Sequence, residues 1–232
     1  MKKLLLCLVL TGWVLFQSSN AVADYVYGIG AKDIITFTKS TGPNDGGEFT
    51  WVAANGYTWQ SFCIEKNENI SLNHSYEVQG ISGYAMAGGI KGQDAKIDGI
   101  SADSLNNETA WLFWNFSMGT LGTGAYQYDS NFSINNKYVH QGYLQNIIWY
   151  LEGEIDSLND KTKKYYKAWN SDYLDALNLG WKNQGQVQVV NLGSGKQDQL
   201  IIGTPVPEPG TMVLLGFGLI GIAGIGRKRL KK

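Results

Sequence analysis

Short runs of β-branched and aromatic residues alternate with turn residues over the first third of the chain that follows residue 24. Runs of this length and composition predict β-strands. The expected strands cover residues 25–30, 33–38, 48–53, 58–64 and 76–81.

The run 58–64 has a pattern that separates its side chains by face. Because successive residues of a strand point to opposite sides, Trp59, Ser61 and Cys63 should share one face. Gln60, Phe62 and Ile64 should then lie on the other face.

The apolar period changes to that of helices in the middle of the chain. Helices are expected at residues 107–118, 137–155 and 161–179. An Asn cap begins the first, and Gly180 ends the third, which has a candidate break near Ser171. The second carries apolar residues at helical spacing: Leu144, Ile147, Ile148, Leu151 and Ile155.

Two further strands are expected at 187–192 and 197–202, after the helices. The order is therefore strands, about three helices, then strands. This order predicts an α+β fold, an antiparallel β-sheet or sandwich with an inserted helical segment. We expect one domain over residues 24–203, because no internal repeat or linker interrupts it.

The N-terminal segment 1–23 has the features of a secretory signal peptide. A basic start precedes an apolar run, and small residues lead to a cleavage site between Ala23 and Asp24. The sequence therefore predicts an exported protein.

The C-terminal segment 204–232 has three parts in a fixed order. Pro207-Glu208-Pro209 is followed by an uncharged, mostly apolar run at 211–226 and by a basic tail. As a helix the run would span roughly 24 Å, less than the hydrocarbon core of about 30 Å. We expect it to insert transiently in the inner membrane, with its basic tail in the cytoplasm.

These three parts together resemble the PEP-CTERM sorting signal of Gram-negative bacteria that produce exopolysaccharide. The resemblance implies that an exosortase recognises Pro207, Glu208 and Pro209 and removes the tail. It also implies delivery to the cell surface or extracellular matrix.

The charge of the working part of the chain limits its partners. Residues 24–206 contain 12 lysines and 19 acidic residues, so their net charge is 12 − 19 = −7, and they contain no arginine. An acidic surface disfavours nucleic acid and anionic membrane as partners. The acidic residues 152–156 are expected to form a solvated helix end.

Cys63 is the only cysteine that follows the leader, so it has no partner for an internal disulfide. A lone cysteine is most often a small buried hydrophobic residue. A Cys–His hydrolase would need His74 or His140, but neither lies in a hydrolase pattern, and no metal-ligand spacing is present.

Two short motifs offer a different explanation for this cysteine. Phe62-Cys63-Ile64 and the run from Leu144 through Gln145 to Trp149 resemble the signature motifs of the internal-thioester domains of bacterial surface adhesins. The resemblance implies that Cys63 Sγ and the side-chain carbonyl of Gln145 are joined with loss of ammonia. Leu144 departs from the family, where a threonine often precedes the glutamine.

Aromatic residues near both motifs would keep water from such a bond. Trp59 and Phe62 flank Cys63, and Trp149 lies one helical turn after Gln145. His140, five residues before Gln145, is the candidate to assist bond formation.

The resemblance implies a cell-surface or biofilm-matrix protein that attaches covalently, once per molecule, to a ligand with an amine or hydroxyl group. An exopolysaccharide is one such ligand, and we expect neither enzymatic turnover nor a cofactor. The alternative is a non-covalent structural or glycan-binding matrix protein without a thioester. The tryptophans that could stack on sugars in that case are Trp51, Trp111, Trp114, Trp169 and Trp181.

Overall fold

The computed structural model describes residues 25–41, 47–86, 95–97, 99–134 and 137–203. The expected signal peptide, its cleavage site at Ala23 and Asp24, and the whole segment 204–232 lie outside the described residues. Among the residues that are described, no helix is long and apolar enough to cross a membrane.

The first strands form a four-stranded antiparallel sheet in the order β5-β4-β3-β6. Its members are β3 (Ile34–Ser40), β4 (Phe49–Ala53), β5 (Thr58–Ser61) and β6 (Ser75–Glu77). The register pairs Trp51 with Trp59 and Phe49 with Ser61. A hairpin of two short strands, β1 (Tyr25–Val26) and β2 (Ile29–Gly30), precedes this sheet.

The last strands return to the early part of the chain. β14 (Gln199–Ile202) pairs with β13 (Val187–Asn191), which pairs with β7 (Gly80–Ser82), all antiparallel. A second three-stranded sheet contains β8 (Tyr84–Met86), β10 (Ile100–Ser104) and β9 (Ala95–Ile97), and a short hairpin joins β11 (Ser133–Ile134) to β12 (Lys137–Tyr138).

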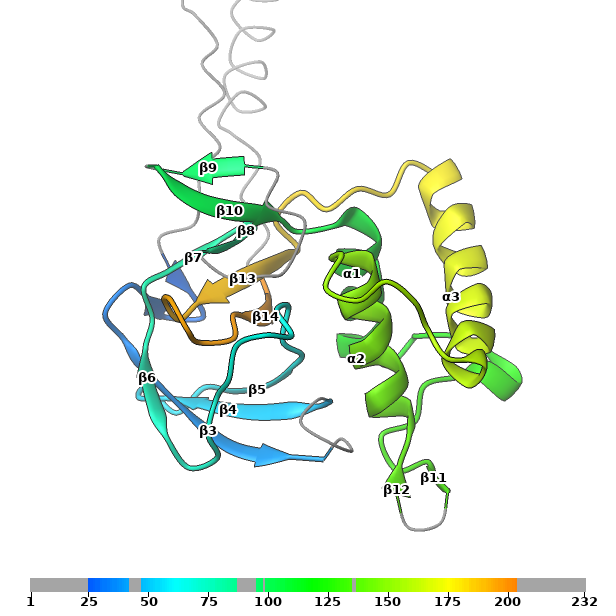
Figure 1. The fold of residues 1–232 in the computed structure, drawn as a ribbon, viewed down its shortest axis with the longest axis horizontal. Coiled ribbons are helices and arrows are strands. Elements are labelled where there is room, and N and C mark those ends of the chain that lie inside the picture. The colour runs from blue at the N-terminus through cyan, green and yellow to red at the C-terminus, as the bar shows by residue number, and fades with distance from the viewer. Residues whose placement is uncertain (1–24, 42–46, 87–94, 98, 135–136, 204–232) are drawn as a thin grey trace, which may run out of the picture.

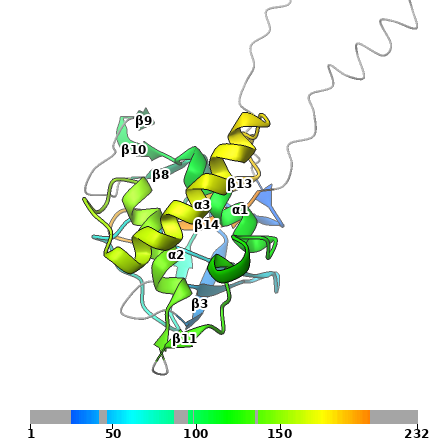
Figure 2. The same cartoon turned by 90° about the vertical axis from the view of Figure 1, so that its right-hand side faces the viewer.

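Three α-helices lie together between these groups of strands in sequence. They are α1 (Asn107–Ser117), α2 (His140–Leu151) and α3 (Asp160–Asn178), with a 3₁₀ turn, η1 (Gly124–Tyr126), after α1. α1 and α2 lie beside the strands, and α3 packs on their outer side (Figures 1 and 2). The predicted α+β class, antiparallel strands with an inserted helical segment, is confirmed.

The helix ends follow local side-chain chemistry. The N-cap of α1 is Asn106, whose side chain accepts from the Glu108 N–H, and Asn159 caps α3 in the same way. Gly180 follows α3 with φ +91°, a conformation that glycine adopts easily. α3 runs through Ser171 without the break considered above.

Several predicted boundaries were wrong. The second helix ends at Leu151 instead of residue 155, and the run 25–30 forms two short strands. The second helix begins at His140 instead of residue 137, because Lys137 and Tyr138 pair with Ser133 and Ile134 as a hairpin. The predicted strand 58–64 ends at Ser61, and beyond it Cys63 makes only an isolated bridge to Gln199.

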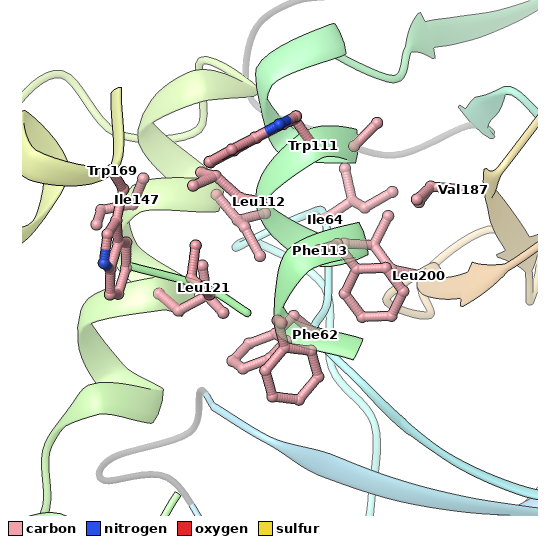
Figure 3. Packing of buried hydrophobic residues seen from close by; sticks show 14 of the residues in the cluster. Phe62, Ile64, Trp111, Leu112, Phe113, Leu121, Ile147, Trp169, Val187 and Leu200 are labelled. Atoms are coloured by element: carbon pink, nitrogen blue, oxygen red, sulfur yellow. The ribbon is translucent and has the colours of Figure 1, made fainter. Parts of the chain in front are cut away.

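Residues 62–64 lie between two buried clusters. Phe62 and Ile64 pack with the helices, Val187 and Leu200, as Figure 3 shows. Cys63 points the other way, into a cluster that contains Trp51, Trp59 and Trp149. The predicted division of this segment into two faces is confirmed, and both of its faces are buried.

Candidate functional site

The chain around Cys63 is fixed by the last strand. Leu200 N–H donates to the Phe62 carbonyl and Ile64 N–H donates to the Asp198 carbonyl, each at 3.1 Å. The Gln197 side chain donates to the Glu65 carbonyl at 2.9 Å. These bonds hold the backbone of Cys63 in place, so the direction of its side chain is set by the fold.

Gln145 reaches the same point from α2. Its neighbours Leu144, Ile147 and Ile148 are fully buried apolar residues that attach α2 to the helical core. Gln145 itself is 0% exposed, as is Cys63. The largely apolar buried face of α2 thus carries Gln145 into the interior.

The structure brings Cys63 and Gln145 into direct contact. Gln145 Oε1 lies 3.3 Å from Cys63 Sγ and accepts from the Cys63 N–H at 3.2 Å. Gln145 Nε2 donates to the Cys63 carbonyl at 2.8 Å. The carboxamide is therefore clamped between the backbone N–H and C=O of the cysteine whose sulfur it faces.

This arrangement places a nucleophile beside an acyl carbon. The carboxamide carbon is one bond of about 1.23 Å from Oε1, so it lies at most about 4.5 Å from the sulfur. The Cys63 N–H donates to the carbonyl oxygen that would gain charge if the sulfur added to that carbon.

The three aromatic residues expected to shield the site all lie near it. Trp59 and Trp149, each 7% exposed, share the buried cluster of Cys63. Phe62 is fully buried on the opposite side and meets Phe116 edge to face, with ring centroids 5.0 Å apart. Water is therefore excluded on both sides of residue 63.

Trp149 also offers a donor. Its indole N–H is buried and has no hydrogen-bond partner within the described part of the chain. Burial raises the pKa of the Cys63 thiol well above its usual value, as does the charge of Glu65, whereas the Trp149 side chain lowers it. Cys63 is therefore a neutral thiol, and the Trp149 indole lies in the same buried cluster.

Buried carboxyl groups surround the cysteine segment, a feature that the sequence did not reveal. Asp198 N–H donates to Glu65 Oε2 at 2.7 Å, and Glu154 Oε2 accepts from Lys66 N–H at 3.0 Å. Burial, followed by the charge of Asp198, raises the pKa of Glu65 well above its usual value. Burial raises the pKa of Asp198 itself to about 7, against the opposing effect of three N–H donors.

The expectation of a solvated acidic helix end at 152–156 was wrong, because Glu152 and Glu154 are only 4% exposed. The sequence contains one signal for the buried polar groups near β14. Gln197, Asp198 and Gln199 form a polar run at the start of an apolar strand, and all three are buried. Polar residues in such a position indicate specific hydrogen bonds.

The two histidines lie in other surroundings. His140 Nδ1 accepts from Asp129 N–H, and Nε2 pairs with the Tyr165 hydroxyl, both at 3.0 Å. With both ring nitrogens engaged there, no contact supports the suggested assistance at Gln145. His74 is exposed and bonds the Leu72 carbonyl, so neither histidine forms a Cys–His pair. Within the described ranges no group of His, Cys, Asp and Glu is arranged to hold a metal ion.

Comparison with known proteins gives one match, at the C-terminus. Residues 205–229 match the PEP-CTERM protein-sorting motif. No curated protein and no solved structure matches the chain. The matched residues include Pro207, Glu208 and Pro209, and the match confirms the sorting prediction. The chain thus carries the PEP-CTERM motif, which marks exported proteins that exosortase sorts to the surface of Gram-negative bacteria.

Proposed function

We propose that Cys63 and Gln145 form an internal thioester, and that this surface protein uses it to attach covalently to a ligand bearing an amine or hydroxyl group. The observation that carries the proposal is the clamped carboxamide of Gln145, whose oxygen lies 3.3 Å from Cys63 Sγ. Both side chains are fully buried, so bulk water does not compete for the acyl carbon.

Bond formation needs only groups that are already in contact. The Cys63 sulfur adds to the carboxamide carbon, and the Cys63 N–H stabilises the oxygen that gains charge. The thiol proton passes to the amide nitrogen, which leaves as ammonia while the Cys63 carbonyl accepts its hydrogen bond. One thiol and one carboxamide thereby give one thioester and one ammonia.

In the capture of a ligand amine, nitrogen would be the attacking atom and sulfur the leaving atom. A ligand amine adds to the acyl carbon of residue 145, the carbon–sulfur bond breaks, and the sulfur receives the proton that the amine loses. The Trp149 N–H, which has no hydrogen-bond partner among the described residues, would stabilise the departing thiolate. Because burial raises the pKa of the Cys63 thiol, the released sulfur ends as a neutral thiol.

A second candidate function is supported by the same contacts. The Gln145 carboxamide is hydrogen-bonded through both its oxygen and its nitrogen without any covalent bond. A satisfied buried glutamine that links α2 to the Cys63 segment would suit a structural or glycan-binding matrix protein with an ordinary thiol.

Intact-mass spectrometry separates the two candidates. The exported protein, purified without a reducing agent, should weigh one ammonia less than its processed sequence. Methylamine should then add to residue 145 and expose one thiol. Cys63→Ala and Gln145→Ala should carry the full mass and ignore methylamine.

Asn146→Ala is the matched control. Asn146 is the neighbouring amide, but its side chain bonds the Gly142 carbonyl within α2. This variant should still lose ammonia. A full sequence mass for freshly prepared wild type, with one titratable thiol, would leave only the non-covalent candidate. Sustained turnover of a chromogenic ester would instead indicate a hydrolase.

A further inference from the structure

A row of parallel aromatic rings leads from the surface to the neighbourhood of Cys63. Tyr27 stacks on Tyr57 with ring centroids 4.4 Å apart, and Tyr57 stacks on Trp59 at 5.9 Å. Tyr27 is 40% exposed, whereas Trp59 is almost fully buried. The outer tyrosines therefore present ring surface to solvent from a rigid support.

The backbone of Tyr27, which holds this ring at the surface, has an unusual positive φ. Tyr27 and Gly28 form the two-residue turn between β1 and β2, with φ of +52° and +74°. Such turns favour Asn, Asp and Gly, and a bulky residue at positive φ is strained. The Asn55 side chain holds the turn by donating to the carbonyls of Tyr27 and Gly28 at 3.0 and 3.3 Å. An aromatic residue at such a strained position points to a use for its ring.

Beside this row lies a hollow of about 300 Å³ between β5 and the end of α1. Its apolar walls include Tyr57, Trp59 and Phe116, and its polar groups include the exposed side chains of Gln60 and Ser117. None of its lining residues is Asp, Glu, Lys, Arg or His. Ring faces with neutral hydroxyl and amide groups suit a ligand that is uncharged, flat on one face and rich in hydroxyl groups.

The floor of the hollow is continuous with the shield of Cys63. Trp59 lies in the hollow, in the cluster of Cys63, and only two residues before it. Phe116, also in the hollow, packs against Phe62 from the opposite side of residue 63. A ligand seated there would lie against the aromatic residues that separate the cysteine from solvent.

We propose that this hollow binds a neutral hexose unit of a polysaccharide, packed against the aromatic side chains of Tyr27 and Tyr57 that line it and hydrogen-bonded by Gln60 and Ser117. The binding itself is independent of the thioester. Its consequence for capture rests on the function proposed above: a bound sugar would hold a hydroxyl beside the shielded bond. The expected acceptor is then a sugar hydroxyl, not a lysine amine.

Calorimetric titration of the Cys63→Ala protein tests the binding alone, since no thioester can form in this variant. The probes are two neutral hexasaccharides, cellohexaose and maltohexaose, and a lysine-rich decapeptide, all titrated at the same concentration. We expect at least one hexasaccharide to bind and the peptide not to bind. Failure of both hexasaccharides to bind at millimolar concentration would overturn the proposal, as would binding of the peptide alone.

Tyr27→Asn, added to Cys63→Ala, separates a binding role from a structural one. Asn suits the positive φ of the turn, so this change should keep or raise the melting temperature while it removes the ring. We expect it to weaken hexasaccharide binding by roughly tenfold, a loss typical of an aromatic anchor. Gln60→Ala should weaken it as well, and unchanged affinity in both variants would refute the assignment. The mass test of the thioester uses the wild-type protein, whereas the titrations of the hollow use variants that lack Cys63. Either proposal can therefore fail without the other.

Discussion

Opening the proposed Cys63–Gln145 bond with methylamine should destabilise the protein by a predictable amount. The bond closes a loop across 82 sequence positions. On the chain-entropy relation for cross-links, loss of this closure lowers the free energy of unfolding by about 4.5 kcal/mol at 25 °C. The methyl group left on the fully buried Gln145 adds on the order of 1 kcal/mol of overpacking.

Urea unfolding at 20 °C, followed by tryptophan fluorescence, measures this effect on one and the same sequence. With an m value of roughly 2–3 kcal/mol/M, the midpoint should fall by about 2 M urea. The m value itself should rise, because the unfolded chain expands once the loop is open. Cys63→Ala treated with methylamine is the control, and its midpoint should not move.

Two results would refute the reasoning in different ways. Absence of methylamine incorporation would show that the bond does not exist. Complete incorporation with a midpoint shift below about 0.3 M would show that the bond exists but does not constrain the unfolded chain as the entropy relation requires.

Three further predictions concern the donor, the buried acids and the chain ends. Trp149→Phe keeps an aromatic shield but removes the indole N–H, so aminolysis by methylamine should slow by roughly tenfold, as measured by the rate of thiol release. Spontaneous hydrolysis releases the same thiolate and should slow as well. An unchanged aminolysis rate would exclude the donor role. Burial raises the pKa of Glu152 from 4.5 to about 8 and that of Asp198 from 3.8 to about 7. At a pH between the unfolded and folded pKa of each group, the folded state therefore binds more protons than the unfolded state. The free energy of unfolding should therefore fall as the pH rises from about 5 to about 8, and a rise over this range in urea titrations would contradict it. The mature protein should begin at Asp24 and lack the basic tail 227–232, and terminal sequencing that finds Lys232 would contradict removal by exosortase.

The contact pair was predicted from the resemblance of two short motifs, and the local period of each half agrees with where its side chain lies. Alternation in 58–64 places Cys63 opposite Phe62 and Ile64, and helical spacing places Gln145 among buried leucine and isoleucine residues. Their meeting was inferred from the two motifs together, and the structure brings them within 3.3 Å. The PEP-CTERM signal was equally local, because its parts are adjacent in sequence.

Features that depend on distant partners escaped prediction. β8, β9 and β10 are short and contain small or polar residues, so they become strands only through their mutual pairing. Asp198 is buried against donors from Met86, Asn191 and Leu192, and Met86 lies 112 positions away in the sequence. The stacked Tyr27 and Tyr57 are 30 residues apart and carry no periodic signal.

The position of β14 determines how the fold would carry a mechanical load. Its last residue, Ile202, is close in sequence to the sorting motif at 205–229, so tension from a surface attachment there would enter the fold along this strand. β14 is bonded on one side to β13 and on the other to the Cys63 segment. A pull along its axis must shear both sets of hydrogen bonds together instead of opening them one after another. The strand that fixes the cysteine is thus also placed to resist a force that pulls on its C-terminal end.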